Sequence, residues 1–136
     1  MTDTFDAKTR SRIMRAVRSK DTGPEMKVRS LTHRLGFRFR LHRKDLPGKP
    51  DLVFPSLRKV MFVHGCFWHR HRSCREATMP ASRREYWEAK LTRSVERDRK
   101  SLVALRKLGW KALVVWECEI RNPEHVERRI SHFLQS

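Results

Sequence analysis

The spacing of hydrophobic residues changes several times along the chain, and each spacing predicts a different element. After Thr22, which opens a Thr-Gly-Pro-Glu capping box, the apolar residues Val28, Leu31 and Leu35 share one face of a predicted helix. Gly36 ends this helix, because glycine readily takes the left-handed conformation found at helix C-termini.

Three strands are predicted next. From Phe37 to Leu41 apolar residues alternate with arginines, which is typical of a half-buried strand. A Pro-Gly-Lys-Pro turn at residues 47–50 then leads to two short apolar runs, DLVF at 51–54 and KVMFVHG at 59–65. The short break between these runs predicts that they pair as a hairpin.

A long helix is predicted from about Pro80 to Leu108, where Gly109 stops it. Its expected inward residues are Trp87, Leu91, Val95, Leu102, Leu105 and Leu108. The apolar run KALVVWEC at 111–118 predicts a buried strand, and residues 123–134 predict a closing helix. The order α-β-β-β-α-β-α, with a long helix between consecutive strands, indicates an α/β fold with a mixed sheet flanked by helices.

The chain is strongly basic. Its 136 residues contain 32 Lys and Arg against 15 Asp and Glu, a net charge of +17. This excess favours nucleic acid as a partner, because neutralising phosphates releases counterions; a ribosome-associated or merely soluble basic protein would also carry it. The length fits one domain at residues 21–136, preceded by a basic, DNA-contacting arm at 1–20 that carries Met14.

No stretch has the roughly 18 apolar residues needed to span a membrane, and the N-terminus lacks an apolar signal core. We therefore expect a protein of the reducing cytoplasm with no membrane partner. Three cysteines are an odd number that cannot close a set of disulfides, so metal ligation explains them better in that compartment.

Cysteine and histidine crowd into HGCFWHRHRSC, residues 64–74. Cys66, His71 and Cys74 form a C-x4-H-x2-C motif, and Cys118 ends the last predicted strand. Three thiolates and one imidazole complete a tetrahedral Zn²⁺ site, which is structural because no position is left for water. Spacing alone does not decide which of the three histidines is the ligand, although His71 is favoured because it lies between the cysteines. Alternatively, Cys118 is a small buried hydrophobic residue and the other two cysteines are incidental.

Pro50-Asp51 places an acid at the start of a strand, where a carboxylate can hold hydrated Mg²⁺; an ordinary turn aspartate is the alternative. His64 and His69 follow the next strand and could approach the same end of the sheet. A carboxylate for the metal and an imidazole that takes a proton from water suffice to hydrolyse a phosphodiester. Glu25 could add a second acid, although its place in the capping box explains it equally well.

Phe67 and Trp68 lie between these two groups, in a loop rather than on an amphipathic stripe. Aromatic side chains on a metal-braced loop of a basic protein can push between stacked bases, at a cost of about a few kcal/mol per opened step. They can equally fill the core beneath the zinc site, and Trp87 can be the first inward residue of the long helix.

Four motifs together resemble the very-short-patch-repair DNA mismatch endonuclease (Vsr) family. They are TRSRIMRAVRSKDTGPE, LPGKPDLVF, HGCFWHRHRSC and SVERDRKSLVALRKLGWKALVVWEC, and they span the chain from about Thr9 to Cys118. The resemblance implies a restriction-endonuclease-like PD-(D/E)xK core, in agreement with the order of elements above. It also implies a Mg²⁺-dependent nickase that cuts 5′ of the thymine in a T:G mismatch, the lesion left when 5-methylcytosine deaminates.

By position, the resemblance makes Asp51 the main Mg²⁺ ligand and His69 the residue that assists the attacking water, with His64 and Glu25 in support. The structural zinc ligands that it implies are Cys66, His71, Cys74 and Cys118. The resemblance also implies that three aromatic residues wedge into the duplex from the major groove. These are Phe67, Trp68 and Trp87. Met14 matches an apolar residue that enters from the minor groove.

The sequence departs from the family pattern in two places. The second acid and the lysine that usually follow the hairpin are missing, since the strand reads Phe-Val-His. Val63 could therefore offer Mg²⁺ only its main-chain carbonyl. The zinc loop, with Arg-Ser between His71 and Cys74, is one residue longer than the tightest form of the family, which affects the placement of the loop aromatics.

Two other functions share part of this pattern. A non-catalytic, zinc-braced DNA-binding module would explain the charge, the cysteines and the aromatics, but it leaves Asp51, His64 and His69 without a role. A related nuclease of the same fold, acting in restriction or on branched DNA, would keep the catalytic residues and lose the mismatch wedge. One nick at an asymmetric lesion requires only a monomer, so we expect a monomer that acts on double-stranded DNA of the bacterial nucleoid.

Overall fold

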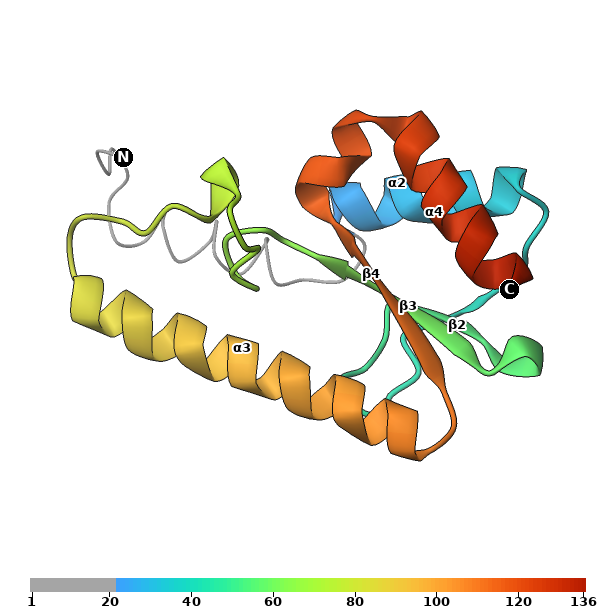
Figure 1. Ribbon diagram of the computed structural model, residues 1–136, viewed down its shortest axis with the longest axis horizontal. Helices are drawn as coiled ribbons and strands as arrows, with labels where there is room; N and C mark the ends of the chain where they lie inside the picture. The colour runs from blue at the N-terminus through green and yellow to red at the C-terminus, as the bar shows by residue number, and fades with distance from the viewer. Residues whose placement is uncertain (1–21) are drawn as a thin grey trace.

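The computed structural model describes residues 22–136, and the predicted basic arm with Met14 lies outside this range. The described helices are α2 (Gly23–Arg34), α3 (Arg84–Lys107) and α4 (Pro123–Gln135). The strands are β1 (Arg40–Leu41), β2 (Leu52–Phe54), β3 (Lys59–His64) and β4 (Lys111–Trp116). Short 3₁₀ turns span Pro55–Leu57, Arg75–Ala77 and Glu117–Arg121. Figure 1 shows α2 and α4 on one face of the sheet and α3 along the other.

The four strands form one mixed sheet in the order β1-β2-β3-β4. The predicted hairpin is confirmed, since β2 and β3 are antiparallel with Leu52 opposite Met61. Helix α3 connects β3 to β4, which pair in parallel with Val63 opposite Val115. Such a connection must cross the sheet, and a helix on its face is the usual solution. The predicted α/β class and mixed sheet are therefore confirmed.

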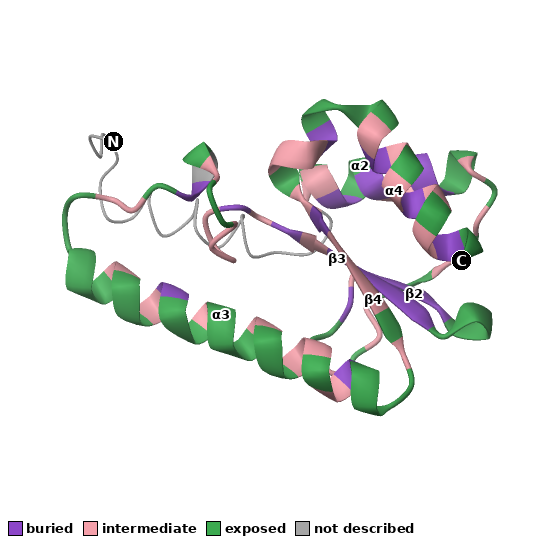
Figure 2. Ribbon diagram, viewed as in Figure 1, coloured by how far each residue is buried: buried purple, intermediate pink, exposed green. Residues whose placement is uncertain are grey.

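Both faces of the sheet are covered, so alternate residues of each strand enter two different cores. The core beneath α2 and α4 contains Val28, Leu31, Leu52, Phe54, Met61, Val115, Ile120, Val126, Ile130 and Leu134. The core against α3 contains Leu46, Val53, Val60, Phe62 and Leu105. Figure 2 shows β2 and most of β3 as the most deeply buried strands. They are central in the sheet, which explains why their sequences read as continuous apolar runs.

Several predicted boundaries and buried positions were wrong. Helix α3 begins at Arg84, four residues after Pro80, and its N-terminal half extends past the sheet (Figure 1). Val95 is therefore 41% exposed, and Leu108, which follows the last helical residue, is 53% exposed. The first strand is limited to two exposed residues, because it lies at the edge of the sheet.

Strand β4 is shorter and less buried than predicted. It ends at Trp116, and Cys118 lies in the 3₁₀ turn that follows. As the other edge strand it pairs with β3 alone, so only Val115 is fully buried and its neighbours are half-buried.

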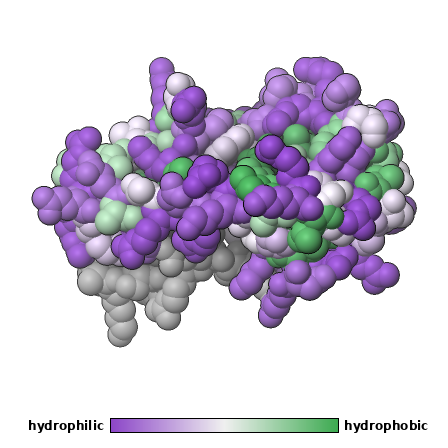
Figure 3. Space-filling view, turned by 60° about the horizontal axis from the view of Figure 1, so that its bottom comes forward, coloured by the Kyte–Doolittle hydropathy of each residue, from purple (hydrophilic) through white to green (hydrophobic). Residues whose placement is uncertain are grey.

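No helix within residues 22–136 is long and apolar enough to cross a membrane. Hydrophilic residues cover most of the face shown in Figure 3, and hydrophobic residues gather only in small areas between them. This face is therefore suited to a polar, charged partner.

Candidate active site and metal centre

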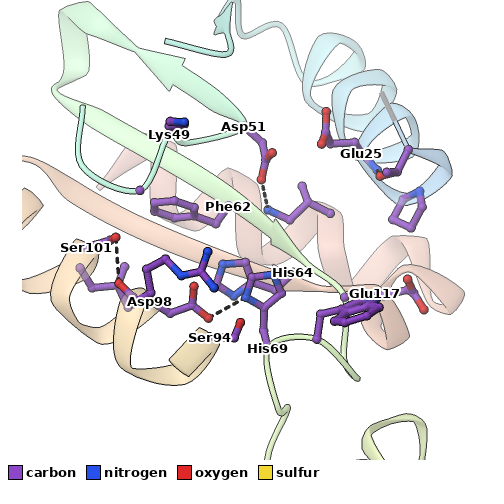
Figure 4. Close-up of a pocket in the computed structure, with 18 of the residues that line it drawn as sticks. Glu25, Lys49, Asp51, Phe62, His64, His69, Ser94, Asp98, Ser101 and Glu117 are labelled. Atoms are coloured by element: carbon purple, nitrogen blue, oxygen red, sulfur yellow. Dashed lines mark hydrogen bonds and ion pairs between the residues drawn. The ribbon is translucent and has the colours of Figure 1, made fainter. Parts of the chain in front are cut away.

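One cavity of about 790 Å³ lies where α2, the adjoining ends of β2 and β3, the loop after β3 and α3 meet. The predicted catalytic residues that line it are Glu25, Asp51, Val63, His64 and His69. Figure 4 shows these side chains arriving from opposite sides, with Glu25 on α2 and Asp98 on α3. The fold thus brings every predicted catalytic residue to one place.

Asp51 lies where β2 and β3 separate. Its own N–H donates to the Met61 carbonyl, and this is the last main-chain bond of the hairpin at that end. Two residues further along β3, the N–H of Val63 donates to Oδ2 of Asp51 at 2.6 Å (Figure 4). The carboxylate replaces a main-chain partner and is held rigidly at the mouth of the splayed strands.

A second acid approaches Asp51 from α2. The carboxylate of Glu25 is buried and accepts a hydrogen bond from Arg29 at 2.7 Å, and Arg29 also contacts Nε2 of His42 at 3.0 Å. Ligand atoms of Glu25, His42 and Asp51 all lie within 4.8 Å of one another. The Glu25 N–H also donates to the side chain of Thr22, as the predicted helix cap requires, and the role of Glu25 as a second acid stays a prediction.

Burial, together with the nearby Glu25, raises the pKa of Asp51 to about 7, while the Val63 N–H opposes the shift. At this pKa the carboxyl group is only partly ionised at neutral pH, and a nearby cation favours the ionised form. The arrangement therefore suits a divalent cation at Asp51, for which oxygen ligands from carboxylates are appropriate. The carbonyl of Val63 as a second ligand stays a prediction.

The histidines form a separate group on the α3 side of the cavity. The rings of His64 and His69 stack with centroids 3.8 Å apart, and Nδ1 of His69 lies 2.6 Å from Oδ2 of Asp98. Burial, followed by the influence of His69, lowers the pKa of His64 to about 3, so this ring is neutral at physiological pH. His69 is the half-exposed member and is the one oriented by a carboxylate.

Sequence reasoning missed Asp98, His42 and Arg29. A signal for Asp98 did exist, because it lies seven residues after Leu91 and seven before Leu105, on the inward stripe of α3. An acid among apolar inward positions indicates a buried polar contact. His42 carries no such signal, since it lies in a loop whose path only the fold reveals.

The four predicted zinc ligands converge, although they come from two segments far apart in the chain. Ligand atoms of Cys66, His71, Cys74 and Cys118 lie within 4.8 Å of one another. The N–H of Cys118 donates to the sulfur of Cys66 at 3.4 Å, and the ring of His71 stacks on Trp116. His71 is the only histidine of the loop in this group, since His64 and His69 face the cavity.

The chemistry of this group fits a metal ion. Sulfur atoms on a tetrahedral Zn²⁺ with Zn–S bonds of about 2.3 Å lie nearly 4 Å apart, which is compatible with ligand atoms that all lie within 4.8 Å of one another. Burial, together with the neighbouring thiols, raises the pKa of Cys66 to about 12. Thiolates become stable in such a place only beside a cation, so the donor set matches a structural metal rather than reactive cysteines.

Four aromatic rings gather next to the cavity. Phe67 and Trp68 of the loop meet Trp87 of α3 at centroid distances of 5.5 and 5.9 Å, and Tyr86 packs against Trp87. The Lys90 ammonium lies 5.5 Å from the ring of Trp68. None of these rings belongs to either core cluster, so Trp87 joins the loop aromatics instead of the sheet core.

Similarity to known proteins identifies the family to which this chain belongs. A family described as DNA mismatch endonuclease Vsr matches residues 2–76. The chain is 51% identical over 134 residues to Type II nicking enzyme V.XorIIP of Xanthomonas oryzae pv. oryzae (strain KACC10331 / KXO85), which covers 98% of both chains. The chain belongs to the Vsr family.

Two further Vsr-type relatives cover most of the chain. The DNA mismatch endonuclease Vsr of Escherichia coli (strain K12) is 45% identical over 91% of this chain and 79% of its own length. Type II nicking enzyme V.NmeAIP of Neisseria meningitidis serogroup A / serotype 4A (strain DSM 15465 / Z2491) is 41% identical over 99% and 96%. The match to the Vsr family model ends before Trp87, Asp98 and Cys118, but these relatives extend the similarity over them.

Proposed function

We propose that this member of the Vsr family is a Mg²⁺-dependent DNA endonuclease that nicks double-stranded DNA 5′ of the thymine in a T:G mismatch. The mismatch would arise from deamination of 5-methylcytosine, as in very short patch repair. The observation that carries the proposal is one cavity that holds both Asp51 and the His69–Asp98 pair beside an aromatic cluster. Relatives named as a mismatch endonuclease and as nicking enzymes support it.

Asp51, with the main-chain carbonyl of Val63, would hold Mg²⁺, which supplies charge neutralisation at the scissile phosphate. The Val63 N–H holds Oδ2 of Asp51 in place, and the carboxylate would bind the metal from this fixed position. Glu25 adds a second negative charge nearby and further favours a cation over a proton. Arg29 holds Glu25 in place.

His69 would take the proton from the attacking water. Asp98 accepts the hydrogen bond from Nδ1, which leaves Nε2 as the basic nitrogen. The water oxygen forms a bond to phosphorus, the bond from phosphorus to the 3′ oxygen breaks, and that oxygen gains a proton. The products are a 5′-phosphate and a 3′-hydroxyl. His64 stays neutral, so its stacking on His69 adds no competing positive charge.

The aromatic cluster supports mismatch selectivity. Phe67, Trp68 and Trp87 are half-buried, and their loop would be braced by zinc bound to Cys66, His71, Cys74 and Cys118. Rings held in this way can enter a base step, at a cost that is lowest where pairing is already weak. A T:G pair offers such a step. We expect a monomer that works in the bacterial cytoplasm on nucleoid DNA.

A nicking assay tests this function. Matched and T:G-mismatched duplexes with several flanking sequences, each strand labelled separately, are incubated with Mg²⁺ or EDTA. We expect cutting of the thymine strand only, at the mismatch only, and none by Asp51→Ala. Cutting of matched or branched DNA would instead favour a related nuclease of the same restriction-endonuclease-like class. Tight binding without cutting would favour a non-catalytic DNA-binding module.

A further inference from the structure

The loop before β2 is pressed against the far wall of the cavity. Gly48 has φ +78°, and a Cβ built on it would lie 2.8 Å from Cβ of Ser101 and 3.1 Å from Phe62. Only glycine therefore allows the loop to approach α3 and β3 so closely. Pro50 is buried behind it, so the main chain on both sides of residue 49 has a fixed path.

Lys49 itself has φ +49°, a left-handed conformation that a residue with a Cβ seldom adopts. Its N–H donates to the Leu46 carbonyl, which closes the turn. A conformation of this kind persists where the surroundings impose it, and it is concentrated at functional sites. Here its effect is to place an exposed lysine on the wall of the cavity, two residues before Asp51.

The charge of Lys49 has no partner in the described part of the chain. Its ammonium forms no hydrogen bond or ion pair with residues 22–136, whereas Lys90 in the same cavity lies over aromatic rings. Figure 4 shows Lys49 on one side of Asp51 and Glu25 on the other.

Four acidic residues line the cavity: Glu25, Asp51, Asp98 and, on the turn after β4, Glu117. The basic residues lining it are Lys49, Lys90 and Arg97. A phosphodiester approaching this many acids requires cations beside them.

We propose that Lys49 binds a non-bridging phosphate oxygen of the DNA strand being cut and thereby positions that strand against Asp51. The inference rests on DNA as the substrate in the proposed function. It assigns a positioning role, because Lys49 would act on a phosphate and not on the attacking water. An ammonium suits this role, since it is a compact charge that can follow a phosphate on a flexible stem.

Salt dependence of binding provides the first test. Affinity for a T:G duplex without added Mg²⁺ is measured over a range of salt concentrations for the full chain and for Lys49→Met. Loss of one phosphate contact reduces the slope of log K against log salt by about 0.9. Lys49→Arg should keep the wild-type slope. Lys111→Met, an exposed lysine at the opposite end of the sheet, is the matched control and should also keep it.

Neutral phosphates provide the second test. Single methylphosphonates are placed along the cut strand near the mismatch, one position at a time. At one position the methylphosphonate should lower the affinity of the wild type. At that same position it should leave the affinity of Lys49→Met unchanged, because the variant has already lost the contact. If Lys49→Met folds poorly, Lys49→Gly replaces it, because glycine accepts φ +49° without a side chain.

An unchanged salt slope, or equal sensitivity of the variant and the wild type at every position, would overturn the assignment. Because both readouts are binding measurements without Mg²⁺, they do not depend on cutting. If the wild type binds DNA with the predicted dependence on Lys49 but never nicks it, the proposed endonuclease function is refuted. The contact between Lys49 and a phosphate is still supported in that case.

Discussion

Nδ1 of His69, in the loop after β3, lies 2.6 Å from Oδ2 of Asp98 in the middle of α3. The carboxylate selects the ring orientation and the tautomer, because it can only accept a hydrogen bond. Nε2 is then the unprotonated nitrogen, as the proposed role of His69 as a base requires. A loop histidine thus acquires a fixed orientation from a residue 29 positions away.

Replacing Asp98 with Asn should therefore slow nicking while DNA binding survives. An amide can donate to Nδ1 and favour the wrong tautomer, and we expect a loss on the order of 10²-fold in the single-turnover rate. Glu96→Gln, on the exposed side of the same helix where Glu96 pairs with Arg99, is the control and should nick normally. Normal nicking by Asp98→Asn would remove His69 as an oriented base.

Asp51→Asn should stabilise the metal-free protein at high pH. The pKa of Asp51 is about 7 when folded and 3.8 unfolded, so between these values the folded state holds an extra proton and stability falls as pH rises. This loss of unfolding free energy is absent below about pH 3.8 and complete above about pH 7. We expect the variant to gain on the order of 2–4 kcal/mol at pH 8 and nothing at pH 3.5. Denaturant unfolding in EDTA measures this, and a gain independent of pH would contradict it.

Two leucines near the end of α3 should differ sharply in their effect on stability. Leu105 is fully buried against Val53 and Val60, whereas Leu108 is 53% exposed. Leu105→Ala should cost about 2–5 kcal/mol of unfolding free energy and Leu108→Ala less than about 0.5. Chemical denaturation compares the two variants directly, and similar costs would show that α3 does not pack as described.

Removal of one predicted zinc ligand should abolish metal binding and weaken the fold. Cys118 joins the turn after β4 to the loop after β3, so Cys118→Ala frees both segments. We expect about one Zn²⁺ per chain in the wild type and none in the variant, with a lower Tm. His132→Asn, which changes an exposed histidine of α4, should retain the metal. Zinc retained at full occupancy by Cys118→Ala would exclude it as a ligand.

Trp68→Ala should reduce nicking at the mismatch. Loss of one stacked ring costs about 1–3 kcal/mol, which corresponds to roughly 5- to 150-fold in rate. A fluorescent adenine analogue beside the mismatch should brighten with the wild type, as the step opens, but not with the variant. Leu57→Ala, in the turn between β2 and β3 at the other end of the sheet, is the control. An unchanged nicking rate with Trp68→Ala would show that the aromatic cluster has only a structural role.

Much of the fold could be predicted because its signals are local. Capping at Thr22, the stop at Gly36 and the two apolar runs of the hairpin depend on neighbouring residues, and all three were confirmed. Val95 and Leu108 failed because helical spacing shows which residues share a face and not how far a sheet extends beneath them. The sequence contains nothing that sets the length of α3 beyond the sheet.

The sequence by itself determined the elements, the basic charge, the family and the identity of the candidate ligands, since residue types and short spacings carry that information. The tertiary structure alone decided that Asp98 orients His69, that His42 joins the pair of Arg29 and Glu25, and that Lys49 faces the cavity. The first two contacts join residues 29 and 13 positions apart in the chain. They exist because the two cores hold α2 and α3 on opposite faces of one sheet, and packing, not local spacing, sets the distance between them.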